Sequence, residues 1–262
     1  MNPPASNATA PESNASARSS LLARIANVIA APGEVFDEVK HAPPSAWNWL
    51  LPTLLLILVG WPGVWLVFSQ PAMRQQQDEA QLKVVQRLVE KGKVPREQAE
   101  AMQQNTGGGG VWKYALGPSV GVVALSFASP FWGAFVMWLI GSKIHKGGFG
   151  YVKALEVSGL SNTVLVLGSV VKTLLILSLG SIYASTSAAM VLRNFDPFNL
   201  VHVILGMLDF FALWACVVSA LGMARLGNLG FGLCLTWLLL VWAGLNGVIL
   251  ALVAGFRALL GL

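Results

Sequence analysis

The chain has 262 residues, of which 55% are hydrophobic and 11% are charged, and its mean hydropathy is +0.64. A soluble domain carries roughly 25% charged residues, so this composition excludes a soluble enzyme, a disordered protein and a small disulfide-stabilised secreted domain. In so apolar a chain the net charge of +5 favours contact with anionic lipid over nucleic acid, and the two cysteines, both within apolar runs, indicate neither a disulfide framework nor a metal site.

The amino-terminal segment divides into a polar tail and two short helices. Residues 1–20 are rich in Ser, Asn, Ala and Pro and contain no apolar run, so we expect them to be a disordered tail. Across residues 21–40 apolar side chains recur at helical spacing in two pieces separated at Pro32. Both pieces are too short to cross a membrane. They fit equally well on the membrane surface or packed against the ends of the membrane-spanning helices.

Five apolar segments are long enough to cross the approximately 30 Å hydrocarbon core of a bilayer. They cover about residues 47–68, 114–140, 155–179, 201–223 and 231–254. The predicted fold class is therefore all-α, a polytopic membrane bundle of five transmembrane helices with interfacial amino-terminal helices and a helical loop. Residues 21–262 form the membrane domain in this interpretation.

The helical loop separates the first two segments. Residues 72–104 contain an apolar stripe and a turn at Gly92 and Pro95, which predicts an extramembrane helical hairpin. The hairpin could bind a partner, lie on the lipid headgroups or cover the end of the bundle as a solvated cap.

The next loop carries the clearest orientation signal. Lys143, Lys146 and Lys153 follow the second segment with no acidic residue before Glu156, which favours a cytoplasmic amino terminus. These three lysines are also candidates for a loop that faces a partner or lipid. Glu156 follows Lys153 by three residues, a spacing typical of an ion pair on a helix surface.

Two ionisable residues fall inside predicted spans. Lys172 and Asp209 both lie about eight residues from the same membrane face, roughly 12 Å deep, so we predict an intramembrane ion pair between them. In the alternative, the Lys172 side chain extends to the headgroups while Asp209 accepts hydrogen bonds from backbone or hydroxyl groups.

Three stretches together resemble the Yip1 family of five-span membrane proteins. They are APGEVF at residues 31–36, followed by Pro43, Pro44 and Trp47; KGGFG at 146–150, leading through Lys153 and Val157 to GLS at 159–161; and LDFFALW at 208–214, running on to GMAR at 222–225. The chain differs from the family pattern at Leu160, where Tyr is frequent, and at Asn162 and Thr163, where Pro is usual. The resemblance implies five spans and a cytosolic amino terminus, in a member of the bacterial type. Eukaryotic members bind small GTPases and other membrane proteins in vesicle trafficking.

The predicted function is that of a non-enzymatic membrane organiser or adaptor in the bacterial cytoplasmic membrane. Its partners would be the lipid bilayer and other membrane proteins or a second copy of itself, without nucleic acid. No catalytic residue, metal site or cofactor is predicted, because no cluster of His, Cys, Asp or Glu has a ligand spacing. A small transporter or channel subunit is the alternative, and a lipid-modifying enzyme is a third reading.

Overall fold

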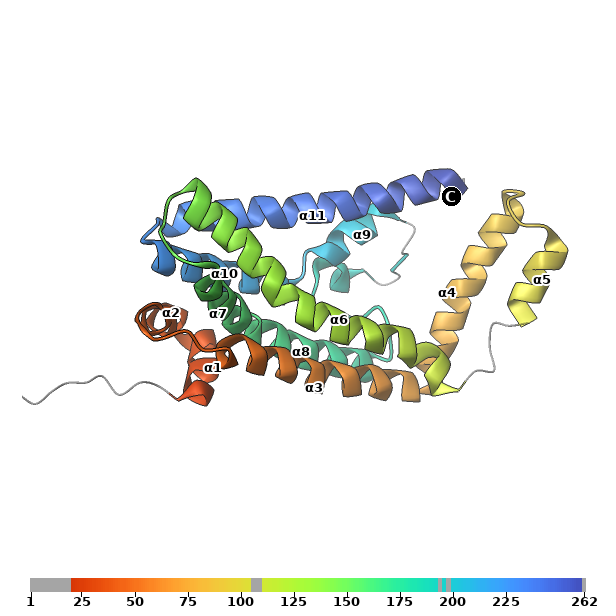
Figure 1. The fold of residues 1–262 in the computed structure, drawn as a ribbon. Coiled ribbons are helices and arrows are strands. Elements are labelled where there is room, and N and C mark those ends of the chain that lie inside the picture. The colour runs from red at the N-terminus through yellow and green to blue at the C-terminus, as the bar shows by residue number, and fades with distance from the viewer. Residues whose placement is uncertain (1–19, 105–109, 193–194, 197–198, 261–262) are drawn as a thin grey trace, which may run out of the picture.

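The computed structural model describes residues 20–104, 110–192, 195–196 and 199–260. Within these ranges the secondary structure is helical without a strand, and five helices are long and apolar enough to cross a membrane (Figure 1). The predicted fold class, an all-α membrane bundle with five transmembrane helices, is confirmed. Nearly all of the tail predicted for residues 1–20 lies outside the described residues.

The spans run to and fro between two ends of the bundle (Figure 1). They are α3 (Trp47–Ser69), α6 (Val111–Met137) with its π-helical continuation η1 (Trp138–Ile144), α7 (Tyr151–Ser161) with α8 (Thr163–Leu179), α10 (Phe210–Gly227) and α11 (Phe231–Leu260). At 1.5 Å per residue, even the 18-residue α10 is about 27 Å long, close to the thickness of the hydrocarbon core.

The fourth predicted span, residues 201–223, is not one continuous helix. A short helix, α9 (Leu200–Met207), ends just before Leu208, and α10 begins after Asp209. The Asp209 carboxylate caps α10 by accepting a hydrogen bond from the Ala212 backbone N–H at 3.0 Å, and the Asp209 backbone pairs with that of Ser187. A capping carboxylate satisfies an N–H group that the first helical turn leaves unpaired, so the chain can restart a helix here despite its continuous apolar pattern.

Glycine lets α3 approach its neighbours closely. A Cβ atom at Gly60 would lie 2.9 Å from Cγ1 of Val122 in α6, and one at Gly63 would lie 2.7 Å from Oγ1 of Thr173 in α8. Small residues at such positions are a general means of bringing membrane helices together. The three spans α3, α6 and α8 consequently form one tightly packed layer.

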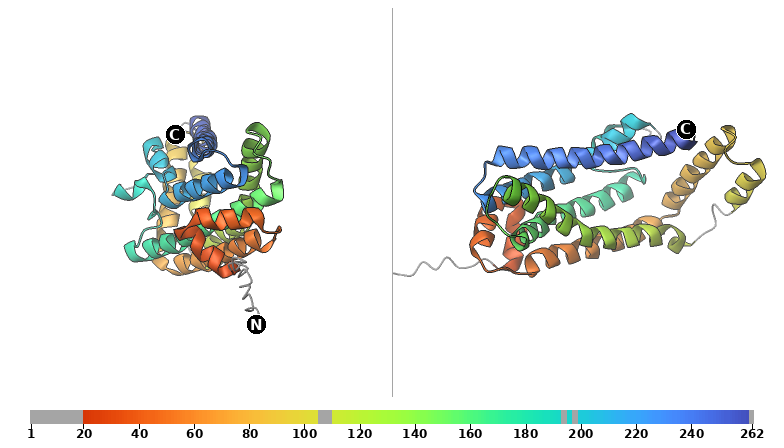
Figure 2. Two further views of the ribbon diagram at one scale, coloured as in Figure 1. Left: turned by 90° about the vertical axis from the view of Figure 1, so that its left-hand side faces the viewer. Right: turned by 45° about the horizontal axis from the view of Figure 1, so that its top comes forward.

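The two short amino-terminal helices lie across one end of the bundle (Figure 2, left). They are α1 (Leu21–Ala30), whose first turn is capped by the Ser20 hydroxyl, and α2 (Pro32–His41), which begins with proline as helices often do. Val28, Phe36 and Val39 are fully buried. Of the two placements considered, packing against the ends of the spans is the one that the structure shows. We call residues 21–46, which comprise α1, α2 and the connection to α3, the amino-terminal platform.

The opposite end of the bundle carries the long loop and the segment between α8 and α10. The loop forms two helices, α4 (Pro71–Glu90) and α5 (Arg96–Gln104), at the position of the predicted hairpin. α4 lies across this end of the bundle (Figure 1). The second segment contains a short 3-10 helix, η2 (Ala188–Val191), and α9.

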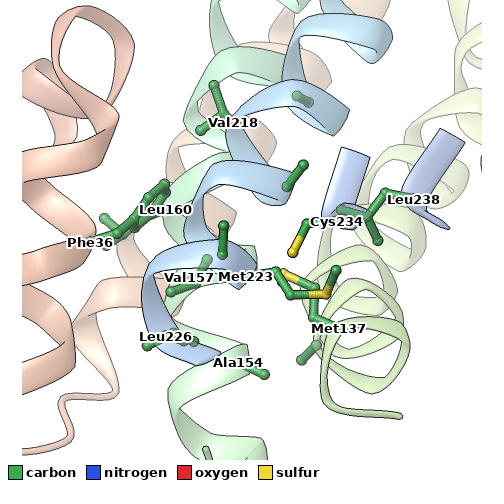
Figure 3. Close-up of a cluster of buried hydrophobic side chains, with 14 of the residues drawn as sticks. Phe36, Met137, Ala154, Val157, Leu160, Val218, Met223, Leu226, Cys234 and Leu238 are labelled. Carbon is green, nitrogen blue, oxygen red and sulfur yellow. The ribbon is translucent and has the colours of Figure 1, made fainter. Parts of the chain in front are cut away.

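The main hydrophobic core lies near the platform. Phe36 of α2, Val157 and Leu160 of α7, and Met223 of α10 belong to one buried cluster, which also includes Met137 (Figure 3). In contrast, Cys234 and Leu238 are the buried hydrophobic residues of α11 among its described side chains. The outward surface of α11 is left for lipid or for another protein.

Candidate functional site

The platform docks where the three family-like stretches of sequence meet. A Cβ atom at Gly222 of α10 would collide with Cγ1 of Val157 and lie 3.2 Å from the Phe36 ring. A Cβ atom at Gly33, near the start of α2, would lie 3.3 Å from the guanidinium of Arg225. The glycine in α10 therefore makes room for the aromatic ring of α2, and the three stretches form a single docking site.

A buried ion pair on α7 attaches the platform to the spans. Glu156 of α7 is only 1% exposed, and its Oε1 accepts hydrogen bonds from the Ser45 backbone N–H and from Nδ2 of Asn48, both at 2.7 Å. The ammonium of Lys153 lies 2.8 Å from Oε2 of Glu156 and donates hydrogen bonds to the carbonyl oxygens of Val39 and Ala42, both at 2.7 Å. The lysine thus binds the last turn of α2 and the carboxylate of α7 together.

The Lys153–Glu156 ion pair predicted from the sequence is confirmed, but the prediction that it lies on a helix surface is wrong. The Lys153 ammonium lies within ion-pair distance of Oε2 of Glu156, which makes no hydrogen bond to a described residue. Two N–H donors of the Lys153 ammonium are taken up by carbonyl oxygens, and the carboxylate supplies the opposite charge. Since a buried charge is costly unless it is paired and hydrogen-bonded, this arrangement fixes the platform in one position.

The polar network continues to α1 through Asn48. While the Asn48 amide nitrogen donates to Glu156, its oxygen accepts a 3.4 Å hydrogen bond from Arg24. Arg24 also forms a 2.7 Å ion pair with Glu38 of α2. Both helices of the platform are consequently tied to the spans α3 and α7 by one chain of polar contacts.

A second set of contacts joins α2 to the end of α10. The Lys40 ammonium donates to the Arg225 carbonyl oxygen at 2.8 Å and to Oδ1 of Asn228 at 2.7 Å, and the Arg225 guanidinium pairs with Asp37 at 3.0 Å. Asn228 has a left-handed backbone, as is common just past a helix end. Because a cation near the last carbonyls of a helix is favourable, Lys40 also stabilises the end of α10.

The three candidate lysines of the second loop have different surroundings. Lys143 and Lys146 are exposed, and the Lys143 ammonium lies 5.0 Å from the centre of the Trp138 ring. Lys153, by contrast, is taken up by the buried network. Only Lys143 and Lys146 are therefore available to a partner or to lipid headgroups.

Lys172 and Asp209 are not brought together. Asp209 accepts hydrogen bonds from the Thr186 hydroxyl and the Ala212 backbone, while Lys172 is exposed on α8. No ion pair links the two in the part of the chain that the structure describes. The hydrogen bonds of Asp209 are those of the alternative reading, in which a hydroxyl and a backbone group serve as donors.

Asp209 nevertheless lies at depth in the bundle. A Cβ atom at Gly168 would touch the Phe211 ring at 2.8 Å, and Gly168 is eleven residues, or about 16 Å, before the end of α8. The segment that carries Thr186 therefore returns into the bundle to meet Asp209. Irregular backbone at such a depth is tolerated when it is covered by protein or lines a watery cavity.

No group of three or more His, Cys, Asp or Glu residues is placed to hold a metal ion among the residues described. Nδ1 of His41 donates to the Asp37 carbonyl oxygen, the His145 ring lies against Trp237, and Nδ1 of His202 accepts from the Asp196 backbone N–H. Each of the three histidines thus contacts a different residue. The expectation of no cofactor and no catalytic residue stays a prediction.

The residues matched by the Yip1 domain run from 26 to 254, which is nearly the whole chain. The chain belongs to the Yip1 family. The match begins within α1 and so includes most of the platform, in addition to the first four spans and most of α11. No curated protein and no solved structure matches the chain. This Yip1-family protein is accordingly a multi-pass integral membrane protein, and its family is generally non-enzymatic.

Proposed function

We propose that this Yip1-family protein is a non-enzymatic membrane organiser that binds other membrane proteins, or a second copy of itself, through its amino-terminal platform. The observation that carries the proposal is the docking of the platform. Two helices too short to span are tied to α3 and α7 by a network around the buried Glu156 carboxylate, and to α10 by Lys40 and Arg225. Simple apolar contact with the membrane surface would have held them more loosely. A fixed surface lowers the ordering cost that a partner meets on binding, so the network favours recognition.

The exposed side of the platform is available for such a partner. Asn27 and Ala30 of α1, and Glu34 and His41 of α2, are exposed. By analogy with the family's cytosolic amino terminus, this face lies in the cytoplasm of a bacterial cell in our proposal. The exposed Lys143 and Lys146 on the same side fit that orientation, because cytoplasmic loops are enriched in basic residues.

Position-specific crosslinking tests this function. A photo-reactive amino acid is placed at Asn27 or Glu34, and at Leu58 of α3 as a lipid-facing control, and the protein is purified in native lipid discs. We expect a membrane protein in stoichiometric amount, crosslinked from the two platform positions and not from Leu58. Phe36→Ala, which removes the ring that seats α2, should abolish the crosslink. Equal crosslinking from all three positions, or recovery of lipid alone, would contradict the proposal.

A small transporter or channel subunit is the second candidate, and the broken fourth span favours it. Discontinuous helices with a polar group at their break are a common feature of transporter sites. Here α9 and α10 meet at Asp209, deep in the bundle and hydrogen-bonded to Thr186. Flux measured in reconstituted vesicles separates this function from the first, since an organiser without a pathway would leave vesicle permeability unchanged.

A further inference from the structure

A cavity of about 250 Å³ lies between α6, the α7–α8 junction, α10 and α11. Most of its lining is apolar, with Trp132, Cys216 and Trp242 among the side chains. The Ser129 hydroxyl in its wall already accepts a hydrogen bond from Asn162 at 2.9 Å. Since an apolar cavity of about 150 Å³ takes up benzene and excludes water, this larger one suits a hydrocarbon occupant.

The cavity lies in the half of the bundle nearer the platform. Its lining on α7 and α8 runs from Ser158 to Leu165. Gly159, within that stretch, is in direct contact with Trp49 at the start of α3. Leu165, in turn, is 14 residues, or about 21 Å, from the end of α8 at the opposite side. The cavity is therefore at the depth of the lipid chains in the leaflet on the platform side.

The cavity opens toward lipid between α6 and α11. These two helices lie close together at the platform end and diverge toward the other end (Figure 1). Trp132 of α6 and Leu245 of α11 line the cavity and are also 49% and 41% exposed, so they form its outer rim. An acyl chain could enter from the bilayer at this rim without leaving a hydrocarbon environment.

Basic side chains lie at the platform end of the same cavity. Met137 lines the cavity, and Lys143 follows six residues later on the continuous helix α6–η1. From the other side, the Trp237 ring of α11 lies 5.9 Å from the His145 ring, and the next residue of α11 lines the cavity. Lys143 and Lys146, which flank that histidine, are exposed and form no ion pair with another described residue.

We propose that the cavity binds one acyl chain of an anionic phospholipid from the platform-side leaflet, with the headgroup held by Lys143 and Lys146. Lipid chains are as apolar as the cavity wall, so the transfer of a chain from bilayer to cavity contributes little selectivity. Selectivity comes from the headgroup, because basic residues at the membrane surface attract anionic lipid. The site is independent of the proposed organiser function and stands or falls separately from it.

Photo-reactive lipids test the site in the full-length protein reconstituted in lipid nanodiscs. Trace phosphatidylglycerol or phosphatidylcholine with a diazirine in one acyl chain is added, and the adducts are mapped by mass spectrometry. We expect phosphatidylglycerol to label cavity residues such as Cys216 and Ser219, and phosphatidylcholine to label them roughly tenfold less. Lys143→Gln with Lys146→Gln should reduce the phosphatidylglycerol adducts to the phosphatidylcholine level. Lys91→Gln with Lys93→Gln, which neutralises two exposed lysines at the other end, should leave them unchanged.

A cavity-filling variant separates the cavity from the outer surface of the bundle. Cys216→Phe should abolish the adducts, whereas Val217→Phe, at the next and outward-facing residue, should preserve them. Ser219→Leu is the milder filling variant if Cys216→Phe fails to fold. Equal labelling by the two lipids would overturn the proposal. So would labelling that persists in the filled cavity.

Discussion

The two ends of the bundle use ion pairs in opposite ways. At the platform end, Glu156 is 1% exposed and its pair with Lys153 is surrounded by hydrogen bonds to two other segments. At the opposite end, the pair between Arg87 of α4 and Asp196 is 3.5 Å long, with 40% and 43% of the two side chains exposed. An exposed pair contributes little to stability because water and salt screen it. Separating a buried pair leaves an uncompensated charge in the interior, so the folded state requires both partners in place.

The platform end also has more buried hydrophobic contacts than the opposite end. The platform end contains the main core, while the opposite end has a small cluster of four buried residues, Val67, Met73, Ile176 and Ala184. There, α4 is held by a few hydrogen bonds. The Gln76 amide bonds the Gly180 carbonyl and the Ile182 N–H, and the Asp78 carboxylate accepts from the Tyr114 hydroxyl. Regions with few buried contacts open locally at low cost, so the far end is the end that can rearrange.

Removal of the Glu156 carboxylate should give the largest effect. Glu156→Ala leaves the Lys153 ammonium partly buried without its counter-charge, and the donors of Ser45 and Asn48 lose their acceptor. We expect a loss of about 3–5 kcal/mol in the free energy of unfolding, measured by SDS titration in mixed micelles. Asp196→Ala, which breaks the exposed pair, should cost at most about 1 kcal/mol. Similar losses for the two variants would remove the contrast between the two ends.

A methyl group at Gly222 should have the next largest effect. Gly222→Ala places its Cβ against Val157 and the Phe36 ring, and overpacking of this kind costs about 1–3 kcal/mol. Val157→Ala should recover part of the loss by making room for the new methyl group. Gly121→Ala is the control, because no atom lies within 4 Å of its Cβ position. In that helix the change should be neutral or stabilising by up to about 1 kcal/mol. A loss of equal size at both glycines would show that close packing at Gly222 is not the cause.

Much of the fold could be predicted because hydropathy and length are local properties. Five apolar runs of sufficient length are readable in the sequence, and their helices follow from the need to satisfy backbone groups within lipid. The broken fourth span could not be read in this way, since Leu208 and Asp209 interrupt the helix by capping and not by a change in hydropathy. The available signal was Asp209 itself, because Asp is preferred at the N-cap and helix-forming residues follow it. That preference would have predicted a helix start at this position.

The candidate site was predicted only in part, because its geometry depends on contacts distant in sequence. The i, i+3 spacing of Lys153 and Glu156 indicates an ion pair, but its burial follows from Ser45 and Asn48, more than 100 residues earlier in the chain. Asn48, a polar residue directly beside an apolar run, was the available signal for a buried network. For Lys172 and Asp209 the prediction used depth alone, which does not determine the partner of a side chain, and Asp209 bonds Thr186 and Ala212.

Substitutions at Asp209 should distinguish a helix cap from an ion pair. Asp209→Ala removes the acceptor of both Ala212 and Thr186 and should cost about 1–2 kcal/mol of unfolding free energy, while Asp209→Asn should retain most of the cap. In a double-mutant cycle, Asp209→Ala and Lys172→Ala should be additive within about 0.5 kcal/mol, and Asp209→Ala with Thr186→Val should not. Coupling between positions 209 and 172 would restore the predicted ion pair.

The smallest predicted effect is a pH dependence at the end opposite the platform. Burial, followed by the nearby carboxylates of Asp196 and Glu79, raises the pKa of Tyr183 from its usual value of 10.0. Because the phenol loses its proton more easily in the opened segment than in the folded one, its contribution to stability is complete below pH 10 and declines as the pH rises through the higher folded pKa. After correction for the base-catalysed intrinsic rate, hydrogen exchange around Tyr183 should therefore accelerate above pH 10, while corrected exchange at the platform does not. Tyr183→Phe keeps an aromatic ring against Phe195 and removes the titrating group, so the extra acceleration should disappear in that variant. If it persists, the pH response at this end comes from other groups.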